Sequence, residues 1–520
     1  MENTDSEFFP ETDSNSTLSF ESIQMIRIES IDEITIEPNG ILHTECDSDI
    51  SSIAEEEDIS SISEEESVSE EDNITEEDFT ELTTTAYDIM EEYIKQNILS
   101  LSSPKFYVSM IMHTAEVLYV DVMYSYNIDN DMDENYDEVL FEEIKNFTED
   151  TADVFLEICD IPRRSCVQQD NEINNMTEND TFIMTEKIAV LQSIPQPEQK
   201  TAEWYTFRNN LITASSLWKV FGTKSQVNNL IYEKCKPLDA SVHIRHNTCT
   251  EGPMHWGVKY EPVTVQIYED MFDTKVGEFG CIPHSKYSYI GASPDGINIA
   301  PNSKRFGRML EIKNIVNRDI TGVPKQEYWI QTQIQMETCD LDECDFVETR
   351  FKEYENIDTF FGDTNHEYRG IILHFIERPP TEFNVDTELS NVPYYVYMPL
   401  NIPLYKTDIN EWINIQKEEM NIHNRVLFSV KYWYLDEISC VFIPRNKLWF
   451  SYAVPHIQEI WDTIVKERVE GYEHRASKKR QVSDRSMSIV SDDGITKTVF
   501  SKLVDNPVCL IKLDENGNIL

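Results

Sequence analysis

The residues with the clearest chemical potential lie between Ser288 and Lys313. Two short apolar runs here are typical of neighbouring strands; the first breaks at a turn that contains Asp295, and the second carries Glu311 and Lys313. Side chains two residues apart on a strand share a face, so Glu311 and Lys313 are expected to point the same way. Two carboxylates and an ammonium on one side of a strand pair suit a site that holds a hard divalent cation beside an attacking water. The pattern favours metal-dependent phosphodiester chemistry.

Each fragment also has a plain structural interpretation. A Pro-Asp-Gly turn is common in proteins, and Glu-x-Lys on a strand is usually a solvated, self-paired face. The context supports the functional interpretation, because Glu311 and Lys313 lie within an apolar run and shortly after a turn residue that could converge on them.

The negative charge of the chain is concentrated at its front. The 520 residues carry a formal net charge of −53. Residues 1–190 account for roughly −43 of it, which leaves about −10 for the rest. With 40% hydrophobic and 11% aromatic residues, the chain has room for two to four domains with a sizeable core. The acidity therefore does not exclude DNA as a partner of the later residues.

Residues 1–80 are predicted to form a disordered acidic leader. They contain runs such as Glu55–Asp58 and Glu64–Glu66. A segment so charged cannot bury enough apolar surface to offset its ordering entropy. A solubilising tail, a target of acid-directed kinases and a nucleic-acid mimic are its alternative roles.

Residues 84–185 predict a helical accessory domain. Apolar residues recur at spacings of three and four, which indicates helices near 84–99, 105–125 and 135–159. The acidic, Asn-rich residues 168–182 are expected to be a linker. The most apolar long window, within the second helix, is interrupted by charged residues, so we expect a buried helix and no membrane role.

The ten cysteines and the first residues indicate a reduced, intracellular protein. There is no Cys-x-x-Cys pair, and the start has neither a basic n-region nor an apolar h-region.

Two helices before the central pair carry candidate site residues. Thr213 or Ser215 could cap a helix just after Arg208, an arrangement that binds phosphate or is simply a cap. A helical stripe over residues 251–272 has Glu261 on its flank, where it is either solvated or a third carboxylate.

A third helix is expected after the central pair. Pro324 marks its start, and Tyr328, Gln331 and Gln335 repeat at helical spacing. Glutamines on one face can bind an active-site water or a base edge, or can be surface residues. Residues 344–354 and 368–377 then predict strands that extend the sheet.

The order of these blocks resembles the YqaJ-like viral recombinase family, the lambda-type alkaline exonucleases within the PD-(D/E)xK nuclease class. The resemblance covers residues 199–340 and rests on five motifs in sequence. They are Glu203-Trp204-Tyr205-x-x-Arg208 with Ile212-Thr213-Ala214-Ser215, Gly257-x-x-x-Glu261-Pro262, Ser293-Pro294-Asp295-Gly296, Glu311-Ile312-Lys313, and Tyr328-x-x-Gln331-x-Gln333.

The resemblance implies an α/β fold with a PD-(D/E)xK restriction-endonuclease-like core, in which helices flank a mixed central sheet. We expect this core over residues 195–470, followed by a basic linker and tail over 471–520 with a short strand pair from Thr496. The leader and the helical region suggest a version from a large DNA virus.

The resemblance also assigns catalytic roles. Asp295 and Glu311 would bind metal, with Glu261 as an outer carboxylate. Lys313 would orient or activate water, and Gln331 would lie near that water.

Three further positions match those that hold a 5′-terminal phosphate in the family, namely Arg208, Ser215 and Ser293. The family has another basic residue after the Glu-x-Lys strand. Arg318 is the nearest candidate for this position.

The function implied is a magnesium-dependent exonuclease that degrades linear duplex DNA with a 5′-phosphorylated end in the 5′ to 3′ direction, in viral DNA recombination, repair or maturation. Two Mg²⁺ ions are expected, with Mn²⁺ as a substitute. Expected partners are DNA, a single-strand annealing protein and further copies in a ring. The expected location is the host cytoplasm or a viral factory, with the virion or the nucleus as alternatives.

A structure-specific endonuclease on the same core and a non-catalytic DNA- or protein-binding scaffold remain alternative functions.

Overall fold

The computed structural model describes residues 76–125, 138–167, 176–199, 201–238, 252–377 and 393–476, together with 489–490 and 496–497. Residues 1–75 of the predicted acidic leader lie outside this part, and the prediction is wrong for residues 76–80, where the first helix already begins. The described chain divides into two compact units, 1–472 and 473–520.

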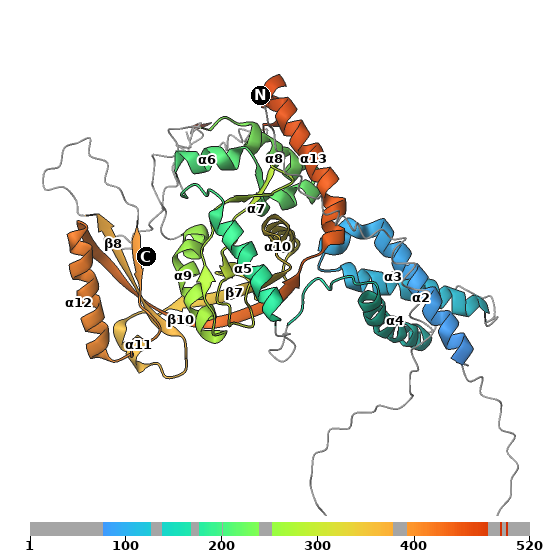
Figure 1. The fold of residues 1–520 in the computed structure, drawn as a ribbon, viewed down its shortest axis with the longest axis horizontal. Helices are drawn as coiled ribbons and strands as arrows, with labels where there is room; N and C mark the ends of the chain where they lie inside the picture. The colour runs from blue at the N-terminus through green and yellow to red at the C-terminus, as the bar shows by residue number, and fades with distance from the viewer. Residues whose placement is uncertain are drawn as a thin grey trace, which may run out of the picture. The chain divides into compact units, whose positions relative to one another are not determined.

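The helices predicted at the front of the first unit are confirmed. Three long helices and a short 3₁₀ turn pack together (Figure 1). Their apolar positions, such as Met90, Ile94 and Met110, are fully buried, as the spacing of three and four requires. The elements are α2 (Glu76–Asn97), η2 (Ile98–Ser102), α3 (Phe106–Ser125) and α4 (Glu138–Ile158). No helix among the described residues has the length and apolar character needed to span a membrane.

A further helix, α5 (Glu178–Ser193), was not predicted, and the linker expected over 168–182 is wrong for its last five residues. Thr177 and Asp180 form a capping box, in which each side chain accepts a hydrogen bond from the other residue's backbone N–H. Ile188 and Leu191 are buried, whereas Phe182, Ile183 and Val190 are exposed, so the apolar residues are spread around the helix and form no recognisable stripe.

The helical region is connected to the rest of the first unit around Arg164. This residue donates to the Ser102 carbonyl at 3.2 Å, and its own carbonyl accepts from the Trp329 indole at 2.9 Å. Gln326 adds a bond of 2.9 Å to the Ser102 hydroxyl. One hydrophobic cluster contains buried residues from Ala86 to Ile464, so the two regions share a core.

The centre of the fold is a mixed seven-stranded sheet, as the sequence predicts. Only one neighbouring pair, β6 and β7, is parallel, and the other pairs are antiparallel. The strands, in their order across the sheet, are β2 (Val276–Gly277), β5 (Gly296–Asn298), β6 (Met309–Asn314), β7 (Glu343–Glu353), β10 (Arg425–Pro444), β8 (Arg369–Glu377) and β9 (Tyr394–Tyr397). The strands predicted at 344–354 and 368–377 are confirmed as β7 and β8.

Helices cover both faces of this sheet. On one face α9 (Pro253–Met271) packs Tyr260 against Phe351 and Tyr268 against Leu310. On the other face α10 (Gln326–Cys339) packs against Met309, which alternates with Leu310 along β6. Since α10 also connects the parallel strands β6 and β7, it is the crossover that such a pair needs.

A smaller sheet lies beside α10. Its strand β4 pairs in parallel with β1 and antiparallel with β3; α6 and α7 contact this sheet, and the 24-residue α13 packs on α8 and η4 next to them. These elements are α6 (Ala202–Asn209), β1 (Ile212–Thr213), α7 (Ala214–Leu217), η4 (Trp218–Phe221), α8 (Lys224–Cys235), β3 (Ile282–Pro283), β4 (Ile290–Ala292) and α13 (Lys447–Glu470).

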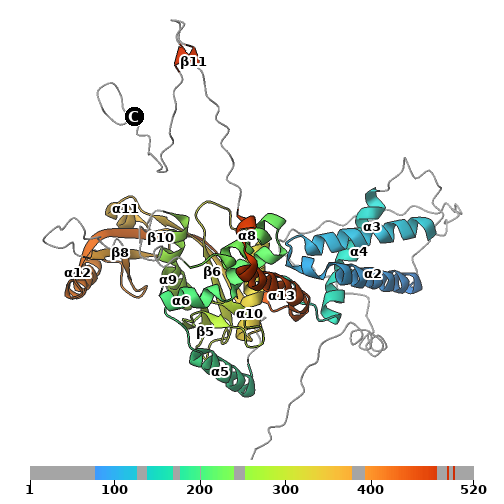
Figure 2. The ribbon, with the colours of Figure 1, turned by 90° about the horizontal axis from the view of Figure 1, so that it is seen from above.

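The far end of the large sheet has its own core. The 20-residue strand β10 pairs with β7 near its C-terminal end and with β8 near its N-terminal end. There α11 (Ile357–Gly362) and α12 (Lys406–Ile422) lie with β8 and β10 (Figures 1 and 2). Phe360, Leu373 and Trp412 belong to the hydrophobic cluster that joins them.

The second unit is described only in part. It contains η6 (Glu473–Arg475) and an antiparallel pair, β11 (Ile489–Val490) with β12 (Thr496–Lys497). Of the strand pair expected from Thr496, one strand begins there, but its partner β11 precedes it in the chain. The rest of the predicted basic run, from residue 477 to 480, lies outside the described residues.

Asp345 on β7 anchors the sheet below α9. It is 1% exposed, and it pairs with Arg305 and, at 3.1 Å, with Arg308. The Tyr268 hydroxyl also donates to it at 2.6 Å. Removal of this carboxylate would leave two guanidinium groups in a buried environment.

Asp345→Ala is therefore expected to lower the free energy of unfolding by about 3–5 kcal/mol, since breaking a buried pair leaves an uncompensated charge. Urea denaturation followed by circular dichroism measures this. The control is Asp342→Ala, whose side chain is 57% exposed, and which should lose less than about 1 kcal/mol. Equal losses in the two variants would contradict the anchoring role.

Candidate active site

Glu311 is the most completely enclosed carboxylate of the predicted site. It lies on β6 with no exposed surface and points toward α10. Its Oε1 accepts from the Lys313 ammonium and, at 2.7 Å, from the Gln331 amide. Its Oε2 accepts from the Gln335 amide at 2.7 Å. Three donors on two oxygens compensate the cost of burying the charge.

Lys313 shares the face of Glu311, as its position two residues along the strand predicts. Its side chain is 23% exposed and lies over the Tyr328 ring at 5.2 Å from the centroid. Burial acts to lower the pKa of this ammonium, but the Glu311 and Asp295 carboxylates outweigh burial and raise the pKa. Lys313 is therefore charged at neutral pH and suited to orienting water or a phosphate.

Asp295 lies between β4 and β5, at the turn predicted from the sequence. Its Oδ2 accepts from the backbone N–H of Ile312 at 2.7 Å, which holds the turn against β6. Burial and the nearby charges of Glu311 and Glu261 raise the pKa of Asp295 well above its usual range. Glu261 reaches this group from α9, so the structure brings the three predicted carboxylates into one electrostatic neighbourhood.

The donor chemistry of these carboxylates fits a hard divalent cation. Oxygen ligands are what Mg²⁺ prefers, and a cation would offset the repulsion that raises the pKa of Asp295. Among the described residues, no group of three or more His, Cys, Asp or Glu side chains is already arranged as a metal cluster. Because Lys313 occupies Oε1 of Glu311, metal binding there would require the ammonium to move aside.

The predicted phosphate-binding residues lie at the end of the small sheet. Arg208 is 3.5 Å from the Ser293 hydroxyl, and its guanidinium stacks on Trp204 at 4.5 Å. The parallel register pairs Thr213 with Gly291, so Ser215 and Ser293 each follow two residues later at the same end. Ser215 is exposed, with its hydroxyl 3.3 Å from that of Thr213. The structure brings Arg208 and Ser293 into contact and leaves Ser215 beside them at the surface of α7.

Gln335 contacts the site but was not among the predicted site residues. It donates to Glu311 and, at 3.2 Å, to the Ser293 carbonyl. The signal was its spacing of four from Gln331, which places both amides on one face of α10. Gln333, which belongs to the family motif, instead donates to the Pro444 carbonyl at 2.9 Å and accepts from the Asn446 backbone at 2.7 Å.

Arg318, the candidate basic residue after β6, pairs with Glu348 on β7. Glu348 is the register partner of Lys313, and Arg318 also lies over the Tyr328 ring at 5.7 Å. Arg318 thus lies next to Lys313, with its charge balanced by a carboxylate.

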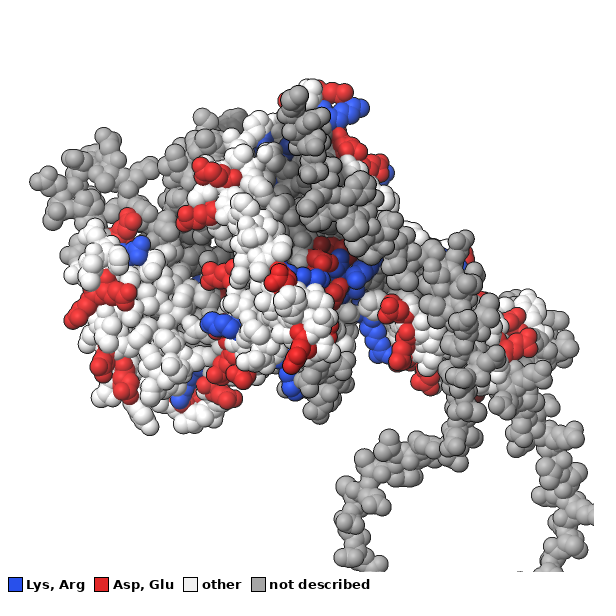
Figure 3. Space-filling view, viewed as in Figure 1, with Lys and Arg blue, Asp and Glu red and all other residues white. Residues whose placement is uncertain are grey.

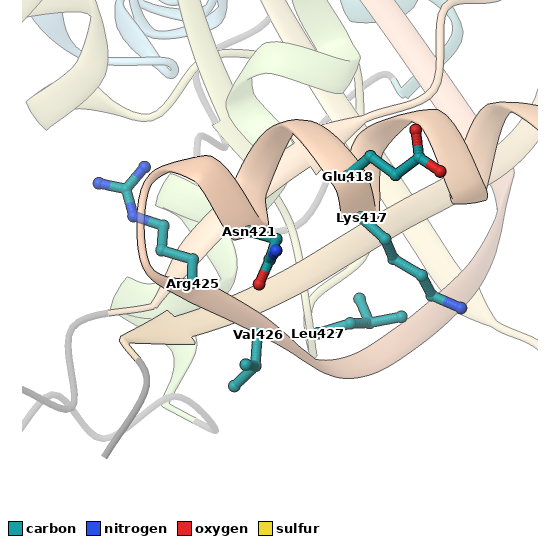
Figure 4. Close-up of a pocket in the computed structure, with 6 residues that line it drawn as sticks. All are labelled: Lys417, Glu418, Asn421, Arg425, Val426 and Leu427. Atoms are coloured by element: carbon teal, nitrogen blue, oxygen red, sulfur yellow. The ribbon is translucent and has the colours of Figure 1, made fainter. Parts of the chain in front are cut away.

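A pocket of about 300 Å³ lies away from these residues, between α12 and β10 (Figure 4). It is lined by Lys417, Glu418, Asn421, Arg425, Val426 and Leu427. None of the predicted site residues lines it, so it is not part of the candidate site.

Acidic side chains are scattered over the face in Figure 3, where basic side chains gather mainly in one place next to acidic ones. Ion pairs of this kind occur where β10 meets α13. Arg445 pairs with Glu337 at 2.6 Å, and Lys447 lies 3.5 Å from Asp342. The positive charge at this junction is therefore largely compensated.

Three comparisons relate this chain to known proteins. Residues 203–342 match the model of the YqaJ-like viral recombinase domain, and every predicted site residue lies in this range. An uncharacterized protein of Acanthamoeba polyphaga mimivirus is 28% identical over 309 residues, which are 54% of this chain and 54% of that protein. The chain thus spans about half the length of the curated relative that it matches.

Two solved structures are also similar. The alkaline exonuclease LHK-Exo from Laribacter hongkongensis is 18% identical and aligns with 52% of this chain and 94% of its own, with a TM-score of 0.29. The LHK-Exo complex with dAMP is 17% identical over the same shares, also with a TM-score of 0.29.

The raised pKa of Asp295 predicts that ionisation of this carboxyl group lowers the stability of the folded protein. The folded state holds the Asp295 proton more tightly than the unfolded chain, so stability should fall as the pH rises from about 4 through the raised pKa. Asp295→Asn removes this loss and keeps an acceptor for Ile312. Without metal at neutral pH, it should raise the Tm by about 2–4 °C, the change that about 1 kcal/mol produces.

Differential scanning calorimetry in EDTA at several pH values tests this, with the exposed Asp319→Asn as the matched control. The gain should shrink toward pH 4, and Mg²⁺ should stabilise the wild type more than Asp295→Asn. A variant less stable than the wild type at neutral pH would contradict the interpretation.

Proposed function

We propose that this protein is a magnesium-dependent DNA exonuclease of a large DNA virus, acting in recombination, repair or maturation, because residues 203–342 match the model of the YqaJ-like viral recombinase domain. The observation that carries the proposal is the buried Glu311, which Lys313 and Gln331 contact while Asp295 is bound to the same strand. A buried ion pair is rarely more stable than apolar residues of the same volume, so stability alone does not explain this hydrogen-bonded carboxylate.

Asp295 and Glu311, with Glu261 as an outer carboxylate, are the residues that would hold Mg²⁺, with Mn²⁺ as a substitute. When bound, two such ions supply an activated water and stabilise the leaving 3′ oxygen. Lys313, charged at neutral pH, orients the water and offsets the charge of the phosphate. Gln331 donates to Glu311, and its family role would be to lie near that water.

The direction of digestion is proposed from the residues expected to bind the terminal phosphate. Arg208 and Ser293 are in contact and Ser215 lies at the same strand end, which suits the capture of a terminal phosphate by a guanidinium and two hydroxyls. The Gln335 bond to the Ser293 carbonyl connects this end to Glu311. A 5′-phosphorylated end bound here would present the first phosphodiester to the carboxylates, so digestion would run 5′ to 3′ on linear duplex DNA.

The family resemblance alone supports three further parts of the proposal. They are a ring of identical subunits around the DNA, a single-strand annealing protein as partner, and action in the host cytoplasm or viral factory. Light scattering of the purified protein tests the ring.

The nuclease prediction concerns Lys313→Met. With Mg²⁺ and linear 5′-phosphorylated duplex DNA, the wild type should digest the substrate, and Lys313→Met should be slower by about 10²- to 10³-fold, because it lacks the charge that orients water. Gel electrophoresis of timed samples measures the rates, and the exposed Lys406→Met is the control.

Closed circular DNA in the same assay separates the alternatives. Its cleavage would favour a structure-specific endonuclease. Binding of both DNA forms without any cleavage would favour the scaffold.

The polarity prediction concerns Arg208→Met. Wild type should digest 5′-phosphorylated ends faster than 5′-hydroxyl ends, and this variant should reduce the ratio by about 10-fold or more, the effect of about 1.4 kcal/mol from a lost charge-assisted bond. Substrates labelled at either end report the direction. If Arg208→Met leaves the ratio of the two digestion rates unchanged, Arg208 does not bind the terminal phosphate.

A further inference from the structure

Gln335 is a second amide on α10 that contacts Glu311. Gln331 and Gln335 are one helical turn apart, and each donates to a different oxygen of the carboxylate at 2.7 Å. With only one amide, the carboxylate could rotate about its terminal torsion, which is soft. With both, the plane of the Glu311 carboxylate is defined.

The same amide nitrogen of Gln335 reaches the segment that carries Asp295. It donates to the Ser293 carbonyl at 3.2 Å, while Asp295 accepts from Ile312 at 2.7 Å. The segment from 293 to 295 is therefore held at one end by α10 and at the other by β6. These bonds set the separation of the two carboxylates predicted to bind metal.

The carbonyl oxygen of Gln335 is a buried acceptor with no hydrogen-bond partner among the described residues. Gln335 itself has no exposed surface. Leaving such an acceptor unpaired costs about 1–3 kcal/mol. This acceptor belongs to the amide that contacts Glu311, so a donor bound beside the carboxylate would find a hydrogen-bond partner there.

We propose that Gln335 is a positioning residue, which orients Glu311 relative to the Asp295 turn and thereby sets the affinity of the site for its divalent cation. The inference rests on the proposed metal-dependent function. Residues that orient metal ligands typically change metal affinity or activity by about 10- to 100-fold when they are removed.

Gln333 provides a matched control on the same helix. Like Gln335, it is fully buried and its amide is hydrogen-bonded, but its partners are the Pro444 carbonyl and the Asn446 backbone, at the start of α13. Gln333→Met thus removes a buried amide of the same size with no contact to the carboxylates.

The experiment compares the full-length wild type with Gln335→Met and Gln333→Met. Titration calorimetry with Mn²⁺ in the absence of DNA measures metal affinity, and digestion of linear DNA over a range of Mg²⁺ concentrations gives the half-saturating concentration. Gln335→Met is expected to weaken Mn²⁺ binding and to raise the half-saturating Mg²⁺ concentration by about 10- to 100-fold. Gln333→Met is expected to lower the Tm and leave both metal values unchanged.

Equal Mn²⁺ affinity in the wild type and Gln335→Met would overturn the proposal, as would a wild type that binds no Mn²⁺. A wild type that binds Mn²⁺ but does not digest DNA would refute the nuclease function, and the calorimetric comparison would still decide the role of Gln335. If Gln335→Met does not fold, Gln335→Asn takes its place, because it keeps a buried amide that is too short to reach Glu311. Unchanged metal affinity in Gln335→Asn would then overturn the proposal.

Discussion

The buried charge of Glu311 is the constraint on which the site depends. A carboxylate with no exposed surface is stable only if hydrogen-bond donors reach it, and here they come from β6 and from α10. The parallel pair β6 and β7 requires a crossover, and α10 is that crossover. The crossover helix α10 therefore also carries the two amides, of Gln331 and Gln335, that stabilise the buried charge of Glu311.

The second carboxylate depends on the antiparallel side of the same strand. Asp295 precedes β5, which pairs with β6, and its bond to Ile312 joins the turn to the strand that carries Glu311. Leu310 and Ile312 pack beneath α9 while Glu311 faces α10, so the alternation of side chains along one short strand separates this hydrophobic packing from the candidate site. The predicted site residues Arg208 and Ser293 are linked to this arrangement through the Ser293 carbonyl and Gln335.

Local periodicity explains which features could be predicted from the sequence. The common face of Glu311 and Lys313, the strands β7 and β8, and the helices α2 to α4 follow from spacings of two, three and four. The glutamines of α10 show the limit of such reasoning. Spacing alone puts Gln331 and Gln335 on one face of α10 and Gln333 on another. Only the structure shows that Gln333 hydrogen-bonds to the backbone at the start of α13 and so has a structural role. The far end of the sheet, with α12, depends on pairing between segments distant in sequence, which no local pattern reports.

The balance of charge bears on how Lys313 can act. Glu311 and Glu261 both contribute negative charge near Asp295. Lys313 contacts Glu311 directly and supplies a positive charge there. Glu311 helps to raise the pKa of Asp295 and also, together with Asp295, raises the pKa of Lys313 against the effect of burial, so the lysine is a poor proton acceptor while these carboxylates are ionised. A divalent cation would reduce the negative field at Lys313 and compete for Oε1 of Glu311. Lys313 and a bound cation would therefore be alternative partners of the same Glu311 oxygen.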